Sequence, residues 1–76
     1  MEENKQAILD ALLPVLRMTR AGKYVTSLEL TEQSGNEYVM ITWVFPPTRR
    51  IAKGRVNVTG DSGAAMIKDV IGRLST

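Results

Sequence analysis

Residues 23–45 read KYVTSLELTEQSGNEYVMITWVF, and this stretch decides the fold. The runs 23–33 and 37–45 are rich in β-branched and aromatic residues, as strands are, and Ser34-Gly35-Asn36 between them tolerates the positive φ of a tight turn. A turn at Ser34-Gly35 places apolar residues opposite one another on one side of a hairpin. A turn at Gly35-Asn36 shifts the partners by two residues and keeps the same face inward. For the first turn the expected pairs are Leu30 with Val39, Leu28 with Ile41, Thr26 with Trp43 and Tyr24 with Phe45.

A third strand is predicted from about Ile51 to Thr59. The second strand ends before it at Pro46-Pro47, because proline has no N–H to donate to a ladder. We expect the third strand to pair with the second so that small residues lie under large rings. The expected pairs are Val56 with Ile41, Val58 with Val39, Gly54 with Trp43 and Ala52 with Phe45.

An amphipathic helix is predicted on each side of the strands. The first covers about 4–21, with Asn4 as N-cap, a kink at Pro14 and Gly22 as a left-handed C-terminal cap. The second covers about 62–74 and is capped by Asp61 or Ser62. The apolar stripes are Ile8, Leu9, Leu12, Leu13, Val15 and Leu16 in the first helix, and Ile67, Val70, Ile71 and Leu74, with Met66 at the edge, in the second.

The expected fold class is therefore α+β, a two-layer sandwich in the order helix, three-stranded antiparallel meander, helix (αβββα). Both helices cover one face of the sheet, and residues 1–76 form a single α+β domain.

This element order resembles that of the double-stranded-RNA-binding domain, whose length is also similar. The resemblance covers the topology of the whole chain. It stops at the positions where that family contacts RNA, the start of the second helix and the loop between the first two strands. Here the helix start reads Asp61-Ser62-Gly63-Ala64-Ala65, with no basic residue before Lys68, and Glu32 and Glu37 flank the loop.

The composition excludes several kinds of chemistry. The chain has neither cysteine nor histidine, which removes thiolate metal sites, cysteine nucleophiles and histidine acid–base pairs. Gly60-Asp61-Ser62-Gly63 matches the nucleophile segment of trypsin-like proteases, but without a histidine base it is better explained as a turn and helix cap. We expect no enzyme activity, no cofactor and no metal site. With no long apolar run and an acidic, polar start at 1–4, we also expect no membrane association and a cytoplasmic location.

The outer face of the sheet is unusually apolar for a solvent-facing layer. A strand open to water alternates toward polar residues, and a narrow apolar strip rimmed by polar groups often marks a protein contact. The predicted interface residues are Tyr38, Met40, Thr42 and Val44 on the second strand and Val25 on the first.

A second feature is a cluster of four basic residues within seven positions, with no acidic residue among them: Arg49, Arg50, Lys53 and Arg55. A smaller group, Arg17, Arg20 and Lys23, follows the first helix. Such a basic arm can follow a phosphate backbone. Equally, charges on an edge strand protect a sheet against edge-to-edge aggregation.

These observations predict a small non-enzymatic module whose partner is another protein or a second copy of the chain. The alternative is a nucleic-acid-binding domain that contacts phosphates through the basic loop and third strand, Arg49 to Arg55.

Overall fold

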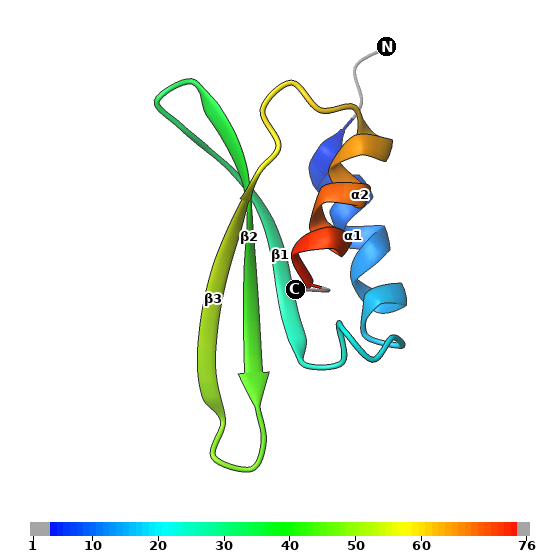
Figure 1. The fold of residues 1–76 in the computed structure, drawn as a ribbon, viewed down its shortest axis with the longest axis vertical. Coiled ribbons are helices and arrows are strands. Elements are labelled where there is room, and N and C mark those ends of the chain that lie inside the picture. Colours follow the sequence, from blue (N-terminus) through cyan, green and yellow to red (C-terminus); the bar gives the residue numbers. More distant parts are fainter. Residues whose placement is uncertain (1–3, 75–76) are drawn as a thin grey trace.

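The computed structural model describes residues 4–74, and their order is helix, three strands, helix. The elements are α1 (Lys5–Leu16), β1 (Val25–Gln33), β2 (Asn36–Phe45), β3 (Arg50–Asn57) and α2 (Gly63–Leu74). The strands form one antiparallel sheet in the order β1-β2-β3, which confirms the predicted α+β fold class. Figure 1 shows both helices on the same side of this sheet, with α1 packed chiefly on β1.

The β1–β2 hairpin turns at Ser34-Gly35. Both residues have positive φ, 53° and 81°, as the two central residues of a tight hairpin turn require. Gln33 therefore pairs with Asn36, and Leu30 and Leu28 pair with Val39 and Ile41 as predicted. The turn chemistry and the apolar alternation select the same register, so this half of the hairpin follows from sequence.

A β-bulge in β1 changes the other half of the hairpin. Val25 pairs with Trp43 and Ser27 pairs with Thr42, so Thr26 has no direct partner. The predicted pairings of Thr26 with Trp43 and of Tyr24 with Phe45 are therefore wrong. The bulge turns Val25 inward, where it is 0% exposed, and leaves Thr26 exposed. Burying the apolar Val25 side chain rather than the polar Thr26 side chain stabilises the folded state.

The register of β3 differs from the prediction by two residues. Val39 pairs with Val56, Ile41 with Gly54 and Trp43 with Ala52. Because a strand repeats every two residues, this shift leaves the same side chains facing inward. Gly54 still lies against the Trp43 ring, since a Cβ at this position would meet ring carbons at 3.1 Å. Val58, beyond the end of β3, is fully buried, and its N–H donates to the Glu37 carbonyl at 2.9 Å.

Helix α1 begins at the predicted cap but ends earlier than expected. The Asn4 side chain accepts a hydrogen bond from the Ala7 N–H at 3.0 Å. The helix continues through Pro14 and ends at Leu16 rather than Ala21. Gly22 is not a left-handed cap. Instead, the Thr19 hydroxyl donates to the Leu16 carbonyl at 2.7 Å and accepts from the Gly22 N–H at 3.0 Å.

The core joins both helices to the inner face of the sheet. Ser62 caps α2, because its hydroxyl oxygen accepts from the Ala65 N–H at 3.2 Å. Within α2, Met66 lies at the centre of the buried side rather than at its edge, and Ile71 is exposed rather than buried. The buried apolar side chains are Leu9, Leu16, Val25, Leu28, Val39, Ile41, Val58, Met66 and Val70.

The free edge of β1 is closed by a side chain from α1. The Gln6 amide donates to the Leu28 carbonyl at 3.2 Å and accepts from the Leu30 N–H at 2.8 Å. One side chain therefore takes the place of a neighbouring strand at this edge, where unpaired backbone groups invite aggregation.

We expect Gln6→Ala to lower the free energy of unfolding by about 1–3 kcal/mol, because it leaves two partly buried backbone groups without partners. Urea unfolding followed by circular dichroism measures this change. Gln33→Ala, at the exposed end of the same strand, is the control and should change stability by less than about 0.5 kcal/mol. Equal losses in the two variants would contradict the role given to Gln6.

Two glycines provide a matched pair of substitutions. A Cβ at Gly22 would lie 2.4 Å from the Leu16 carbonyl oxygen, whereas a Cβ at Gly72, inside α2, meets nothing within 4 Å. We expect Gly22→Ala to cost about 1–3 kcal/mol through this clash, and Gly72→Ala to add about 0.5–1 kcal/mol through helix propensity. Thermal unfolding of both variants tests the prediction, and a neutral Gly22→Ala would contradict it.

Candidate interaction surfaces

Charges are separated along the long axis of the molecule. The segments 11–28 and 38–60 contain seven of the ten basic residues and no aspartate or glutamate. The basic α1–β1 and β2–β3 loops lie toward one end, while the β1–β2 turn and the loop before α2 lie at the other (Figure 1). The second end carries Glu32, Glu37 and Asp61, with Lys5 bonded to Glu37 at 2.9 Å. A net charge of only +2 therefore conceals a distinctly basic end.

The outer sheet face consists of Tyr38, Met40, Thr42 and Val44. The pairing of β2 with β3 places all four on the side away from the helices, and each is partly exposed. Val25, predicted to belong to this face, lies in the core because of the bulge. Ile51 of β3 pairs with Val44 at the other side of β2 and is 63% exposed.

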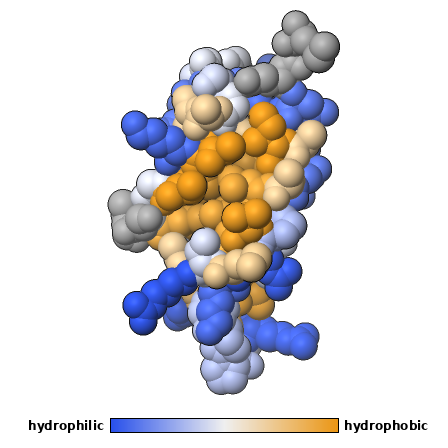
Figure 2. All heavy atoms as spheres, turned by 90° about the vertical axis from the view of Figure 1, so that its right-hand side faces the viewer, coloured by the Kyte–Doolittle hydropathy of each residue, from blue (hydrophilic) through white to orange (hydrophobic). Residues whose placement is uncertain are grey.

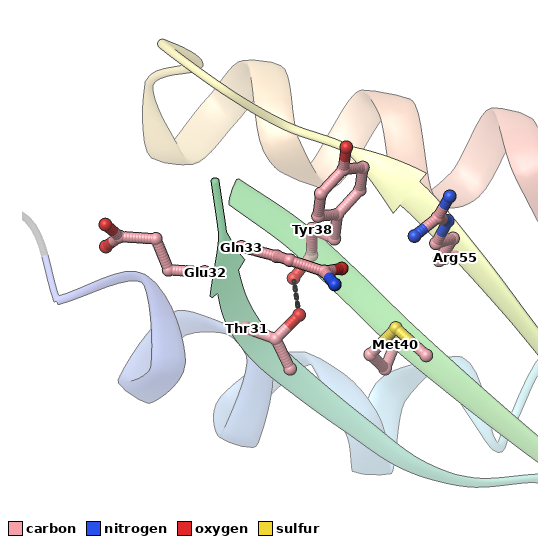
Figure 3. A pocket seen from close by; sticks show the side chains of 6 residues that line it. All are labelled: Thr31, Glu32, Gln33, Tyr38, Met40 and Arg55. Carbon is pink, nitrogen blue, oxygen red and sulfur yellow. Dashed lines mark hydrogen bonds between the residues drawn. The ribbon is translucent and has the colours of Figure 1, made fainter. Parts of the chain in front are cut away.

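A hollow of about 420 Å³ lies at one end of the outer sheet face. In Figure 3 the Arg55 side chain lies near the Tyr38 ring, with its guanidinium carbon 4.7 Å from the ring centroid, and Glu32 points away from the others. Both signs of charge and a thioether line this open hollow, which fits no single ligand chemistry. The lining residues are Thr31, Glu32, Gln33, Tyr38, Met40 and Arg55.

The structure divides the predicted basic cluster between two faces. Lys53 and Arg55 lie on the outer face, opposite Thr42 and Met40. Arg50 pairs with Phe45, whose side chain faces the helix side, and its guanidinium carbon lies 5.5 Å from the Phe45 ring centroid. Arg49 lies in the β2–β3 loop with a φ of 56°. These four residues therefore do not form one continuous basic surface.

One residue of each basic group of the sequence, Lys23 and Arg50, lies against a ring of three aromatic residues, Tyr24, Trp43 and Phe45, which we call the aromatic end. The Tyr24 carbonyl accepts from the Val44 N–H at 3.0 Å, and the Tyr24 and Phe45 rings meet edge to face, with centroids 5.6 Å apart. Lys23 lies 5.6 Å from the centre of the Tyr24 ring. Sequence reasoning paired Tyr24 with Phe45 but did not connect the pair with Lys23 and Arg50.

The side of the helices away from the sheet carries an apolar surface that sequence reasoning missed. Figure 2, which views the molecule from this side, shows hydrophobic side chains gathered over both helices. Val15 is 57% exposed and Ile71 is 45% exposed. Together with half-buried neighbours at helical spacing they form what we call the helix face: Ile8, Leu12 and Val15 of α1, and Ile67, Ile71 and Leu74 of α2. A signal was present in the sequence, because both apolar stripes are broader than one packed side requires.

Asp61, at the end of the molecule that also carries Glu32 and Glu37, lies near the carboxyl group of Asp69. Its Oδ2 atom is buried without a hydrogen-bond donor among residues 4–74, and its neighbour is Asp69 of α2. A hydrogen bond to Asp69 can form only when one of the two carboxyl groups carries a proton, and this favours the protonated form and raises the pKa of Asp61 above 3.8. Loss of hydration and the negative charge of Asp69 act in the same direction, while Lys5 opposes them.

In residues 4–74 we find no group of acidic side chains arranged to hold a metal ion. Over the same range, neither helix has the length and hydropathy needed to cross a membrane.

Comparisons with known proteins add no assignment: no protein-family model, curated protein or solved structure matches this chain.

The raised pKa of Asp61 predicts a pH dependence of stability. The folded state binds this proton more tightly than the unfolded state, so its contribution to stability is present at low pH and is lost as pH rises through the raised pKa. At pH 7 we therefore expect Asp61→Asn to be more stable than the wild type, with the difference vanishing below pH 3.8. Thermal unfolding between pH 3 and pH 7 measures this. Glu29→Gln, on the exposed side of β1, should show no such convergence, and a destabilised Asp61→Asn at pH 7 would refute the prediction.

Proposed function

We propose that this chain is a protein-binding module that pairs with a second copy of itself through the helix face. The observation that carries the proposal is the exposure of Val15 (57%) and Ile71 (45%) within the apolar area on the side of the helices away from the sheet. Contiguous apolar areas rimmed by polar residues mark association surfaces in soluble proteins.

Helix geometry explains why these residues remain exposed. In α1, Ile8, Leu12 and Val15 follow one another at intervals of four and three residues, beside the buried Leu9 and Leu16. In α2, Ile67, Ile71 and Leu74 repeat the same intervals beside the buried Met66 and Val70. Ile8, Leu12 and Leu74 therefore pack in part against the core. Val15 and Ile71 carry most of the apolar area that remains for another partner.

A second copy of the chain is the occupant that this face fits. None of its six side chains is charged, so two identical faces can meet about a two-fold axis without repulsion between like charges. Complete burial of an isoleucine or valine contributes about 1.5–3 kcal/mol, so Val15 and Ile71 from two chains supply a substantial apolar centre. A 76-residue chain with no cysteine also gains most from such added burial.

The outer sheet face is the competing surface for self-association. Tyr38, Met40, Thr42 and Val44 lie together there, with Lys53 and Arg55 at the rim. Ile51 at its β3 side is 63% exposed, but the four residues at its centre are each less exposed than Val15 or Ile71, and two of them carry hydroxyl groups. We therefore favour the helix face and use the outer sheet face as the matched comparison.

The same change, from an apolar residue to glutamate, tests which of the two faces forms the dimer interface. Light scattering during size exclusion should give the wild type a mass twice the 8.4 kDa of one chain. We expect Ile71→Glu to give the monomer mass, because a carboxylate would be buried against apolar side chains, and Met40→Glu to keep the dimer mass. A monomeric wild type would overturn self-association, whereas dissociation by Met40→Glu alone would move the interface to the outer sheet face.

A further inference from the structure

The aromatic end is a site distinct from the helix face. It combines planar rings with cations, which neither apolar surface does. Two residues of β2 and one from the loop before β1 form it: Trp43, Phe45 and Tyr24.

Each ring of the aromatic end has a cation over one of its faces, which leaves the opposite face for a stacked base. Lys23 lies 5.6 Å from the Tyr24 ring centre and Arg50 lies 5.5 Å from that of Phe45. The Arg73 guanidinium carbon of α2 lies 6.0 Å from the Trp43 ring centre. The Tyr24 and Phe45 rings join the Lys23 and Arg50 contacts, because their centroids are 5.6 Å apart.

This end of the sheet is open to solvent. Figure 1 shows that the β2–β3 end of the sheet extends past the ends of both helices. Tyr24 is 37% exposed, and Trp43 and Phe45 are partly exposed. The basic residues of both loops, Arg17, Arg20 and Arg49, lie toward the same end of the molecule.

Rings interleaved with cations match the chemistry of an unpaired nucleotide chain. A base stacks on an aromatic ring regardless of its identity, and arginine or lysine binds the neighbouring phosphate. In a duplex the base faces are already covered by one another, so a double strand can use only the cations. An acidic peptide can likewise use the charges but not the ring faces.

We propose that the aromatic end binds single-stranded nucleic acid, with bases stacked on Tyr24, Phe45 or Trp43 and phosphates bound by Lys23, Arg50 and the loop arginines. This site differs from a purely basic arm at Arg49 to Arg55, because the rings make it selective for unpaired bases. Lys53 and Arg55, on the opposite face of the sheet, are not part of it.

The unmodified protein can report on this binding. Trp43 is its single tryptophan, so its fluorescence reports stacking at the site directly. We expect a 12-nucleotide oligo-dT to quench and shift the Trp43 emission, and its affinity to fall steeply between 20 mM and 200 mM salt. Unchanged Trp43 emission, together with unchanged anisotropy of labelled oligo-dT, would overturn the proposal.

Fluorescence anisotropy with labelled strands separates the rings from the charges. Labelled oligo-dT should bind more tightly than a duplex of equal length, and Tyr24→Leu/Phe45→Leu should weaken the single strand about tenfold while leaving the duplex unchanged. Leucine keeps these positions apolar, and circular dichroism checks that the variant is folded. Equal binding of single strand, duplex and poly-glutamate would reduce the site to a general polyanion surface and overturn the proposal.

A charge-matched pair completes the experiment. Arg50→Glu should weaken binding of both the single strand and the duplex, because it reverses a cation at the site. Lys68→Glu makes the same change of charge on the exposed side of α2 and should have a much smaller effect. Equal effects of the two variants, or no binding of oligo-dT by the wild type at 20 mM salt, would refute the assignment.

Discussion

The β-bulge at Thr26 is the local constraint on which most of this structure depends. It changes which side of β1 enters the core, so that Val25 replaces Thr26 beneath the helices. The same change leaves the Tyr24 carbonyl bonded to Val44 and the Tyr24 ring against Phe45. One extra residue in a strand thereby completes the core and also joins two basic segments of the chain at a common aromatic site.

The two edges of the sheet are protected against pairing with a further strand in different ways. At β1, the Gln6 side chain occupies backbone groups that a further strand would otherwise pair with. At β3, charged residues on alternate positions, Lys53 and Arg55, face outward. Charges of this kind discourage edge-to-edge association, which is consistent with pairing through the helices rather than through the sheet.

The two proposals concern different parts of the molecule and different forces. The helix face consists of uncharged apolar side chains, so association through it depends on burial and responds little to salt. The aromatic end carries cations beside rings, so binding there depends on both stacking and phosphate charge and weakens with salt. The two surfaces share no residue. A chain that pairs through its helices would therefore keep both aromatic ends available.

The element order, the fold class and the inward face of the β1–β2 hairpin follow from the sequence alone. These rest on local signals: the period-2 and helical apolar patterns, the proline pair that ends β2, and residues that tolerate positive φ. It also identified the partly exposed residues of the outer sheet face, Tyr38, Met40, Thr42 and Val44. Asn4 was predicted as a cap for the same reason, since a cap depends only on residues three positions away.

The bulge, the register of β3 and the choice of which α2 residues are buried depend on contacts across the fold. A shift of β3 by two residues keeps the same face inward, so its apolar pattern cannot distinguish the alternatives. The positions of Val25, Met66 and Ile71 depend on what packs against them across the core, and this is not encoded within any one segment. The aromatic end arises in the same way, because Tyr24 and Phe45 lie about twenty residues apart in the chain and meet only when β1 pairs with β2.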